Sequence, residues 1–352
     1  MQLPEMPGWR LGAAAALVAN HADDTWPTSQ WPGVMVLGRS PKALGHGVRL
    51  EHAVIEAAAR VNSRLGAAVA IGLHDRETAH VETARLESAW ATAAGRWTFG
   101  VGRDTVRMGS TVDSAGHLDR FNQAPLAKRA VLNELWTDDG LTVAWQPTDE
   151  MWLQRAEAGV WRGRSFPGGP GGSAVPTLHL QAGWGHVTAH AFVGHLQPQG
   201  RGAAVASVGA VGHSHAVPDC RLSLKQVVCF DGQSDVASTS LQWASEDDRW
   251  ALSVAALGRQ DRGTLYSSSG DAAYRAKLVG VWADVVCRVT PDWTLAVRPE
   301  RLTPRIELNG VGTALLEPVA ASDSVDHRPP STPATSSCSN SAPPGSKTSP
   351  RS

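Results

Sequence analysis

The segment Leu141-Thr142-Val143-Ala144-Trp145-Gln146 decides the fold, because large apolar side chains occupy every second position in it. Alternation with a period of two indicates a β-strand with one apolar face and one polar or small face. The same alternation returns at residues 178–184, 250–254 and 293–298, and turns rich in Gly, Asp, Asn and Pro separate these segments. The chain is therefore predicted to be a large antiparallel β protein whose apolar face contacts either a protein core or lipid.

The composition excludes several classes of protein. The 352 residues include 32 Lys and Arg against 33 Asp and Glu, for a net charge of −1, which argues against a general nucleic-acid binder. No stretch approaches the 18 consecutive apolar residues of a transmembrane helix. The composition does not exclude transmembrane β-strands, because the alternation of apolar and polar residues lowers their mean hydropathy to that of a soluble protein.

Tryptophan is over-represented among the aromatic residues, with 14 Trp against 2 Tyr and 5 Phe. Trp is enriched where membrane and water meet. One interpretation is an aromatic girdle, and the other is the core of a β-sandwich. We favour the girdle, because several tryptophans lie at or near the ends of alternating segments, namely Trp97, Trp145, Trp184, Trp243, Trp250 and Trp293.

The alternation is interrupted once within the chain. Strands are expected at 48–60, 64–74, 78–90 and 95–103, whereas 104–137 has no period of two and includes a short helix that begins at Pro125. Strands resume at 139–147 and continue to 305–317. We therefore assign 1–320 to one β domain with an insertion at 104–137. The Ser- and Pro-rich segment 321–352 is predicted to be a disordered tail.

An ordered set of motifs resembles one known family, the porin-type outer-membrane β-barrels of Gram-negative bacteria. These proteins are related to the phosphate-selective porins and the zinc-regulated outer-membrane receptors. The main match covers 96–167, a second covers 285–302, and the weaker N-terminal third extends the resemblance to about 10–305. The motifs that carry it are Gly95 to Arg103, Met108-Gly109, Pro125-Leu126, Asp138 to Leu141, Pro147-Thr148-Asp149, Gly163 to Gly168, Thr290 to Trp293 and Arg298 to Leu302.

The resemblance implies an all-β fold: a closed antiparallel transmembrane β-barrel of roughly 16 strands in the outer membrane. It also implies that the insertion at 104–137 folds inward and narrows the lumen. The ends of the chain depart from the family. Barrels of this type end in an aromatic residue, whereas this sequence ends at Pro350-Arg351-Ser352, and the Ala-rich segment 11–19 lacks the basic start of a signal peptide. We expect that a signal peptide is missing from this sequence.

Charges at the constriction would set the selectivity of such a channel. The candidate pore-lining residues contain five cations and one anion, which favours anions; they are Arg103, Arg107, His117, Asp119, Arg120, Lys128 and Arg129. The alternative is that several of these cations only pair with lumen carboxylates such as Glu82, Glu87 and Glu157. Arg155 and Glu157 share one strand face and are predicted to form an ion pair in the lumen.

Metal binding and catalysis have less support in the sequence. His213-Ser214-His215 places two imidazoles on one side of an extended segment, where zinc could bind, but solvated loop histidines explain the motif better. The Gly-x-Ser-x-Gly, His-Glu-x-x-His and Walker motifs of common enzymes are absent from the sequence. We therefore expect no enzyme activity and no cofactor.

The sequence thus favours a channel that passes small hydrophilic solutes, either inorganic anions or metal ions. Its expected partners are outer-membrane lipid and these solutes, and nucleic acid is not expected to bind. Assembly into a homo-oligomer is compatible with this interpretation. The alternative is a soluble or secreted β-sandwich that binds other molecules, with carbohydrate suggested by the Trp content. The medium that the apolar strand faces contact separates the two interpretations.

Overall fold

The computed structural model describes residues 3–20, 47–74, 79–115, 121, 124–149, 151–204, 227–267 and 270–310. Fifteen strands form one sheet in which nearly every strand pairs antiparallel with the next strand along the chain. This confirms the predicted all-β antiparallel fold, for which about 16 strands were expected. The tail predicted at 321–352, the end of the last predicted strand at 311–317 and the zinc candidates His213 and His215 lie outside the described residues.

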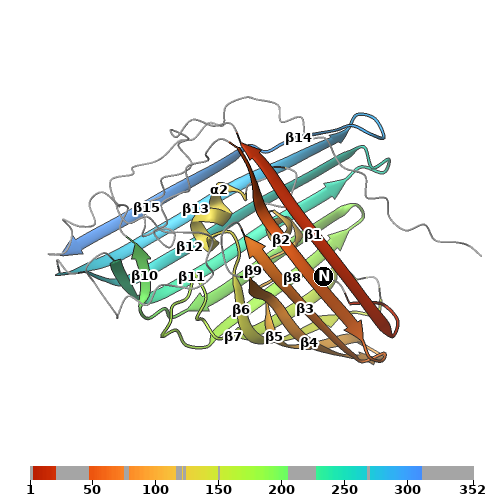
Figure 1. The fold of residues 1–352 in the computed structure, drawn as a ribbon, viewed down its shortest axis with the longest axis horizontal. Coiled ribbons are helices and arrows are strands. Elements are labelled where there is room, and N and C mark those ends of the chain that lie inside the picture. The colour runs from red at the N-terminus through yellow and green to blue at the C-terminus, as the bar shows by residue number, and fades with distance from the viewer. Residues whose placement is uncertain are drawn as a thin grey trace, which may run out of the picture.

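The first half of the sheet follows the chain in order. Its strands are β1 (Gly8–Asn20), β2 (Gly47–Arg60), β3 (Leu65–His74), β4 (His80–Thr92), β5 (Gly95–Thr105), β6 (Thr137–Gln146) and β7 (Leu153–Trp161). The second half continues with β8 (Val175–Trp184), β9 (Val187–Leu196), β10 (Arg201–Ala204), β11 (Val227–Ala244), β12 (Trp250–Ser267), β13 (Gly270–Arg288), β14 (Thr294–Val297) and β15 (Glu300–Gly310). Figure 1 shows that the strands lie side by side in a strongly curved sheet.

The two edges of this sheet are β1 and the β14–β15 pair. Within the described ranges β1 pairs with β2, and β14 and β15 both pair with β13, so closure of the sheet is not observed among these residues. Strands β14 and β15 take successive parts of the same edge of β13. Trp282 of β13 is opposite Glu300, and Val285 is opposite Val297.

Consecutive hairpins bring the short connections to one end of the sheet. We call this the short-turn end, and its turns are 61–64, 93–94, 147–152, 185–186, 245–249 and 289–293. Local chemistry fixes them. Asn62 accepts hydrogen bonds at Oδ1 from the backbone N–H groups of Arg64 and Leu65, both at 2.9 Å. Gly185 has φ of +55°, a conformation that residues with a Cβ atom rarely adopt.

The two faces of the sheet differ in chemistry. One face, which we call outward, exposes large apolar side chains along nearly every strand, including Phe99, Val101, Leu141 and Val281. The other face, which we call inner, carries two helices, α1 (Ser110–Ser114) and α2 (Leu126–Leu132). The helix predicted from Pro125 is α2, with Pro125 as its N-cap.

The segment between β5 and β6 folds onto the inner face, as predicted for the insertion at 104–137. Helix α1 contacts β11 and β12, and helix α2 contacts β12, β13 and β15. A buried apolar cluster joins these helices to six strands; its largest members are Met108, Leu132, Trp136, Trp161, Phe192, Leu196, Leu257, Leu278 and Trp282. Burial of this much apolar surface fixes the segment against the wall.

Candidate pore lining

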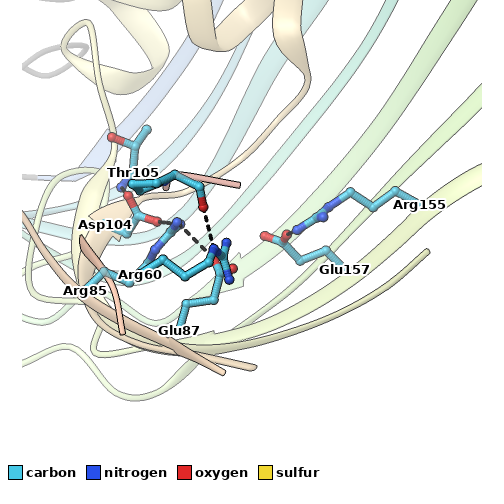
Figure 2. Close-up of polar contacts among 8 residues, drawn as sticks. Arg60, Arg85, Glu87, Asp104, Thr105, Arg155 and Glu157 are labelled. Carbon is cyan, nitrogen blue, oxygen red and sulfur yellow. Dashed lines mark hydrogen bonds and ion pairs between the residues drawn. The ribbon is translucent and has the colours of Figure 1, made fainter. Parts of the chain in front are cut away.

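Three strands on the side of the sheet away from α2 carry charged side chains on the inner face. Arg85 on β4 donates from Nη1 to Oδ2 of Asp104 on β5 at 2.5 Å, and from Nη2 to Oε2 of Glu87 at 3.1 Å. Figure 2 shows the Arg85 guanidinium between the two carboxylates. All three side chains are partly buried, so these ion pairs are less screened than surface pairs.

The ion pair predicted between Arg155 and Glu157 is present on β7. Arg155 donates from Nη2 to Oε2 of Glu157 at 2.5 Å, and Figure 2 shows the pair on the same wall as Arg85. The strand register places Glu157 opposite His179 of β8. Charged or titratable groups of the inner face therefore lie on β4, β5, β7 and β8.

A chain of hydrogen bonds connects this wall to helix α1. His179 Nε2 and His190 Nδ1 are 3.2 Å apart, and the two rings stack with centroids separated by 5.3 Å. His190 Nε2 lies 3.1 Å from Oγ of Ser110, which donates to Oε1 of Gln242 at 2.6 Å. Residues of α1, β8, β9 and β11 thus hold each other in place across the inner face.

Helix α2 is held from its two sides by buried cations. Lys128 is 2% exposed and donates from Nζ to the backbone carbonyls of Ala115, at 2.5 Å, and Asp113, at 3.3 Å. Lys128 therefore satisfies carbonyls at the end of α1, which a helix leaves without internal partners. Burial lowers the pKa of Arg129, and the nearby carboxylates of Glu134 and Glu300 act in the opposite direction.

A fully buried ion-pair network fixes the other side of α2. Oδ2 of Asp261 lies 3.1 Å from both Nη2 of Arg201 and Nε of Arg259, and its Oδ1 accepts from Ser234 at 2.5 Å. Arg259 also donates from Nη1 to the backbone carbonyl of Val131, the second-last residue of α2, at 2.6 Å. Without the shared carboxylate, both guanidinium groups would be buried charges without a counter-ion, which is strongly destabilising.

The charged side chains of β4, β5 and β7 line one small recess on the inner face. Six ionisable groups surround it, three cations and three anions: Arg85, Arg107, Arg155, Glu87, Asp104 and Glu157. Five of these six residues take part in the ion pairs described above. Among the described residues, Arg107 forms no ion pair, and its charge balances the second of the two carboxylates that share Arg85, so the six groups sum to zero.

The structure distributes the predicted pore-lining residues over different environments. Arg107 lines the recess. Lys128 and Arg129 belong to α2; Lys128 contacts the end of α1, and Arg129 is buried near Glu134 and Glu300. Arg103 has the same strand parity as Phe99 and Val101, and it lies on the outward face, 3.6 Å from Asp139. This placement is opposite to the one predicted for Arg103. The predicted His117, Asp119 and Arg120 lie outside the described residues.

Part of this lining was absent from the predicted set of pore residues. Arg85 and Asp104 were not considered, although Arg85 shares the parity of Glu87, and Asp104 has the parity opposite to Val101. Strand alternation extended across the predicted ends of the strands would have found both residues. The contact of His190 with Ser110 joins residues 80 positions apart, and local sequence patterns carry no signal of it.

Metal binding finds no support in the described part of the chain. Its residues contain no group of three or more His, Cys, Asp or Glu side chains that could hold a metal ion. A search of the same residues for helices long and apolar enough to cross a membrane finds none.

No family model and no curated protein matches this sequence. Solved structures resemble it at low sequence identity. The outer membrane channel DcaP of Acinetobacter baumannii is 12% identical, covers 85% of this chain and 78% of its own, and has a TM-score of 0.47. OmpT, an outer membrane protein of Vibrio cholerae, is 13% identical over 76% of this chain and 74% of its own, with a TM-score of 0.46. Salmonella typhi OmpF in complex with daunomycin is 9% identical, covers 84% of this chain and 90% of its own, and has a TM-score of 0.39.

Proposed function

We propose that this chain is an outer-membrane β-barrel channel that admits small hydrophilic solutes through its lumen. The opposite chemistry of the two faces of one sheet carries the proposal. Soluble monomers rarely expose apolar patches larger than a few hundred Å². Here apolar side chains are exposed on the outward face of most strands, while the inner face carries charged groups and the two helices.

The dimensions of the outward face support a membrane position. On β13 and just beyond it, the outward residues from Val279 to Val289 are apolar or small, whereas Arg275 and Lys277 precede them. A tilted strand of about 9–11 residues crosses the hydrocarbon of a bilayer. Residues 279–289 have this length, so they would cross it with the two cations at one surface.

The tryptophans support the same position. Among the tryptophans that the structure describes, eight are exposed, and these lie at or beside the short-turn end: Trp9, Trp90, Trp97, Trp152, Trp184, Trp243, Trp250 and Trp293. Trp152 and Trp184 stack on adjacent hairpins with centroids 6.5 Å apart. A row of indole rings at one rim corresponds to the girdle at a membrane interface.

The alternative β-sandwich requires two sheets whose apolar faces cover each other. The described strands instead form one continuous sheet, and its outward apolar face is exposed. The Ser110–His190 contact also does not support hydrolase chemistry. A nucleophilic serine transfers its proton to a base, whereas the Ser110 hydroxyl donates to Gln242.

We infer inorganic anions rather than metal ions as solutes from Arg107. The six charges of the recess sum to zero, because two carboxylates share Arg85 and one pairs with Arg155. Arg107 is the cation of the recess that forms no ion pair with a described residue, so its guanidinium group can bind a passing oxyanion. The proposed preference for anions therefore rests mainly on Arg107.

Conductance across a planar bilayer tests the proposal. Refolded full-length protein should insert from detergent, produce stepwise conductance, and migrate differently on a gel before and after boiling. In a salt gradient, the sign of the reversal potential should show preference for anions. A protein that stays soluble without detergent and gives no conductance would contradict both the membrane position and the channel.

A further inference from the structure

Four exposed cations lie together on the outward face of β12, β13 and β15. The strand register places Arg262 directly opposite Arg275, and Lys277 directly opposite Arg305. Arg275 and Lys277 are two residues apart on β13 and share its outward face. We call these four residues the cationic patch. Glu307, opposite Arg275, is the one acidic residue among their direct cross-strand partners.

The cationic patch has unfavourable electrostatics in the isolated chain. Like charges directly opposite each other on neighbouring strands repel and destabilise a sheet. Within the part of the chain that the structure describes, none of the four cations forms an ion pair or a side-chain hydrogen bond. The Arg262–Arg275 and Lys277–Arg305 pairs therefore keep most of their repulsion, and Glu307 is the one cross-strand carboxylate that offsets it.

Five other charged or titratable groups on the outward face form ion pairs with each other. Asp139 lies 3.6 Å from Nη1 of Arg103 and 3.2 Å from Nη1 of Arg162. His195 Nδ1 lies 2.7 Å from Oδ1 of Asp235. Asp235 is in register with Gln260, and Gln260 with Lys277, so the paired and unpaired charges lie in one row across the sheet. The cationic patch thus differs from these groups because its four cations form no ion pair with a described residue and have one acidic cross-strand partner, Glu307.

The position of the cationic patch points to the chemistry of the missing anion. Val279 and Val281, the next outward residues of β13 after Lys277, begin the apolar part that would contact hydrocarbon. An anion at this level would be attached to a group whose hydrocarbon lies beside these valines. Guanidinium and ammonium groups bind phosphate through charge-assisted hydrogen bonds. A lipid with a phosphate-bearing headgroup supplies both parts.

We propose that Arg262, Arg275, Lys277 and Arg305 form a binding site for the phosphate groups of an anionic membrane lipid. The proposal rests on the membrane position proposed above. Phosphate placed between the strands would neutralise both like-charge pairs, while the lipid chains would cover the apolar side chains below. Each cation near an anionic membrane surface contributes about a fivefold gain in affinity.

Lipid titration of the full-length protein in neutral detergent micelles tests the site. The probes are diphosphoryl lipid A, its monophosphoryl form and phosphatidylcholine, and the readout is protein thermal stability together with native mass spectrometry. We expect binding in that order of strength. The double substitution R275Q/K277Q should weaken binding of diphosphoryl lipid A by roughly 25-fold, since two cations are lost. Inorganic phosphate, as the free ion, should compete poorly.

The matched control is R249Q/R288Q. These exposed arginines lie on or beside the same strands at the short-turn end and change the net charge equally. The control should bind lipid A like the original chain. The R275Q/K277Q protein should also be at least as stable as the original chain without lipid, because the repulsion is relieved, which separates lost binding from misfolding.

Equal binding of lipid A by both variants would overturn the site, as would full competition by inorganic phosphate. Dimerisation that is lost in R275Q/K277Q would instead assign the patch to contact with a second protein copy and would also overturn it. Conductance separates this inference from the proposed function. A protein that conducts but binds lipid independently of the patch retains the channel, whereas a protein that never inserts loses both.

Discussion

Trp90 on β4 and Trp97 on β5 lie directly opposite each other beside the 93–94 turn, and both indole rings are exposed on the outward face. The register continues to Trp145 of β6, which is opposite Trp97. Three neighbouring strands therefore present tryptophan at the same level. In water this arrangement would expose a large apolar area without gain, whereas at a membrane interface each ring is in its preferred environment.

Fluorescence quenching by brominated lipids should detect this arrangement. We expect bilayers of brominated phosphatidylcholine to quench a large part of the tryptophan emission. The W90F/W97F protein should lose part of the quenchable emission. The control W136F removes an indole that is 1% exposed and should leave the quenchable part unchanged. Emission that is insensitive to bromine would place the outward face away from lipid.

Substitution of Arg107 should change ion selectivity without preventing insertion. R107Q removes the cation of the recess that forms no ion pair with a described residue, and we expect the anion-to-cation permeability ratio to fall about fivefold, for a change of about 1 kcal/mol. The control R103Q makes the same charge change on the outward face, where Arg103 lies beside Asp139. Reversal potentials in a salt gradient measure both. A larger effect of R103Q would show that the two arginines have been assigned to the wrong faces.

The buried network around Asp261 should dominate the stability of the inner face. D261N leaves Arg201 and Arg259 buried with their shared carboxylate gone, and the expected loss is about 3–5 kcal/mol of unfolding free energy. The matched control is D235N, which makes the same substitution in the exposed ion pair of Asp235 with His195. It should lower the unfolding free energy by less than about 1 kcal/mol. Urea unfolding in detergent micelles compares the two. Similar losses would mean that the network contributes little.

Asp113 on α1 should make stability depend on pH. Burial raises its pKa to about 6, even though the backbone N–H groups of Met108 and Gly109 donate to its carboxylate. Between about pH 4 and pH 6 the folded chain keeps this proton while the unfolded chain loses it. The stabilising contribution is therefore complete at low pH and is lost as the pH rises through about 6. The total change is on the order of 3 kcal/mol.

The D113N protein is the test of this pH dependence. Asn cannot ionise, so the loss of unfolding free energy between about pH 4 and pH 6 should become smaller by a similar amount. Unfolding in urea at several pH values provides the measurement for both proteins. An unchanged slope would show that Asp113 titrates normally in the folded chain.

The sequence predicts the strands well because their alternation is a local property. The outward positions of Phe99, Val101 and Leu141 follow from parity alone, and the structure confirms them. Helix α2 is also local, since Pro125 marks its start. Arg103 was the last residue of the predicted strand 95–103 and was still counted with the pore-lining charges, so its parity with Val101 was overlooked. The strand continues to Thr105, beyond the predicted end at 103, and carries Arg103 outward.

The contacts of the insertion are harder to predict, because they depend on how the helices dock. Lys128 has the sequence signature of an exposed cation, but its Nζ reaches the carbonyl of Ala115 on another helix. The three-dimensional position of α1 relative to α2 decides this contact, and no local pattern encodes it. Helix α1 itself has five residues and no side-chain cap, which leaves little sequence signal for its existence.

Among the described residues, the exposed indoles gather at the short-turn end, while the opposite rim carries longer, flexible side chains such as Lys277 and Arg103. In the proposed membrane setting, the two rims would then respond differently to bilayers of unequal thickness. Indoles would hold the short-turn rim at a fixed depth. Hydrophobic mismatch would be absorbed at the other rim, where long cationic side chains can extend toward or away from the headgroups.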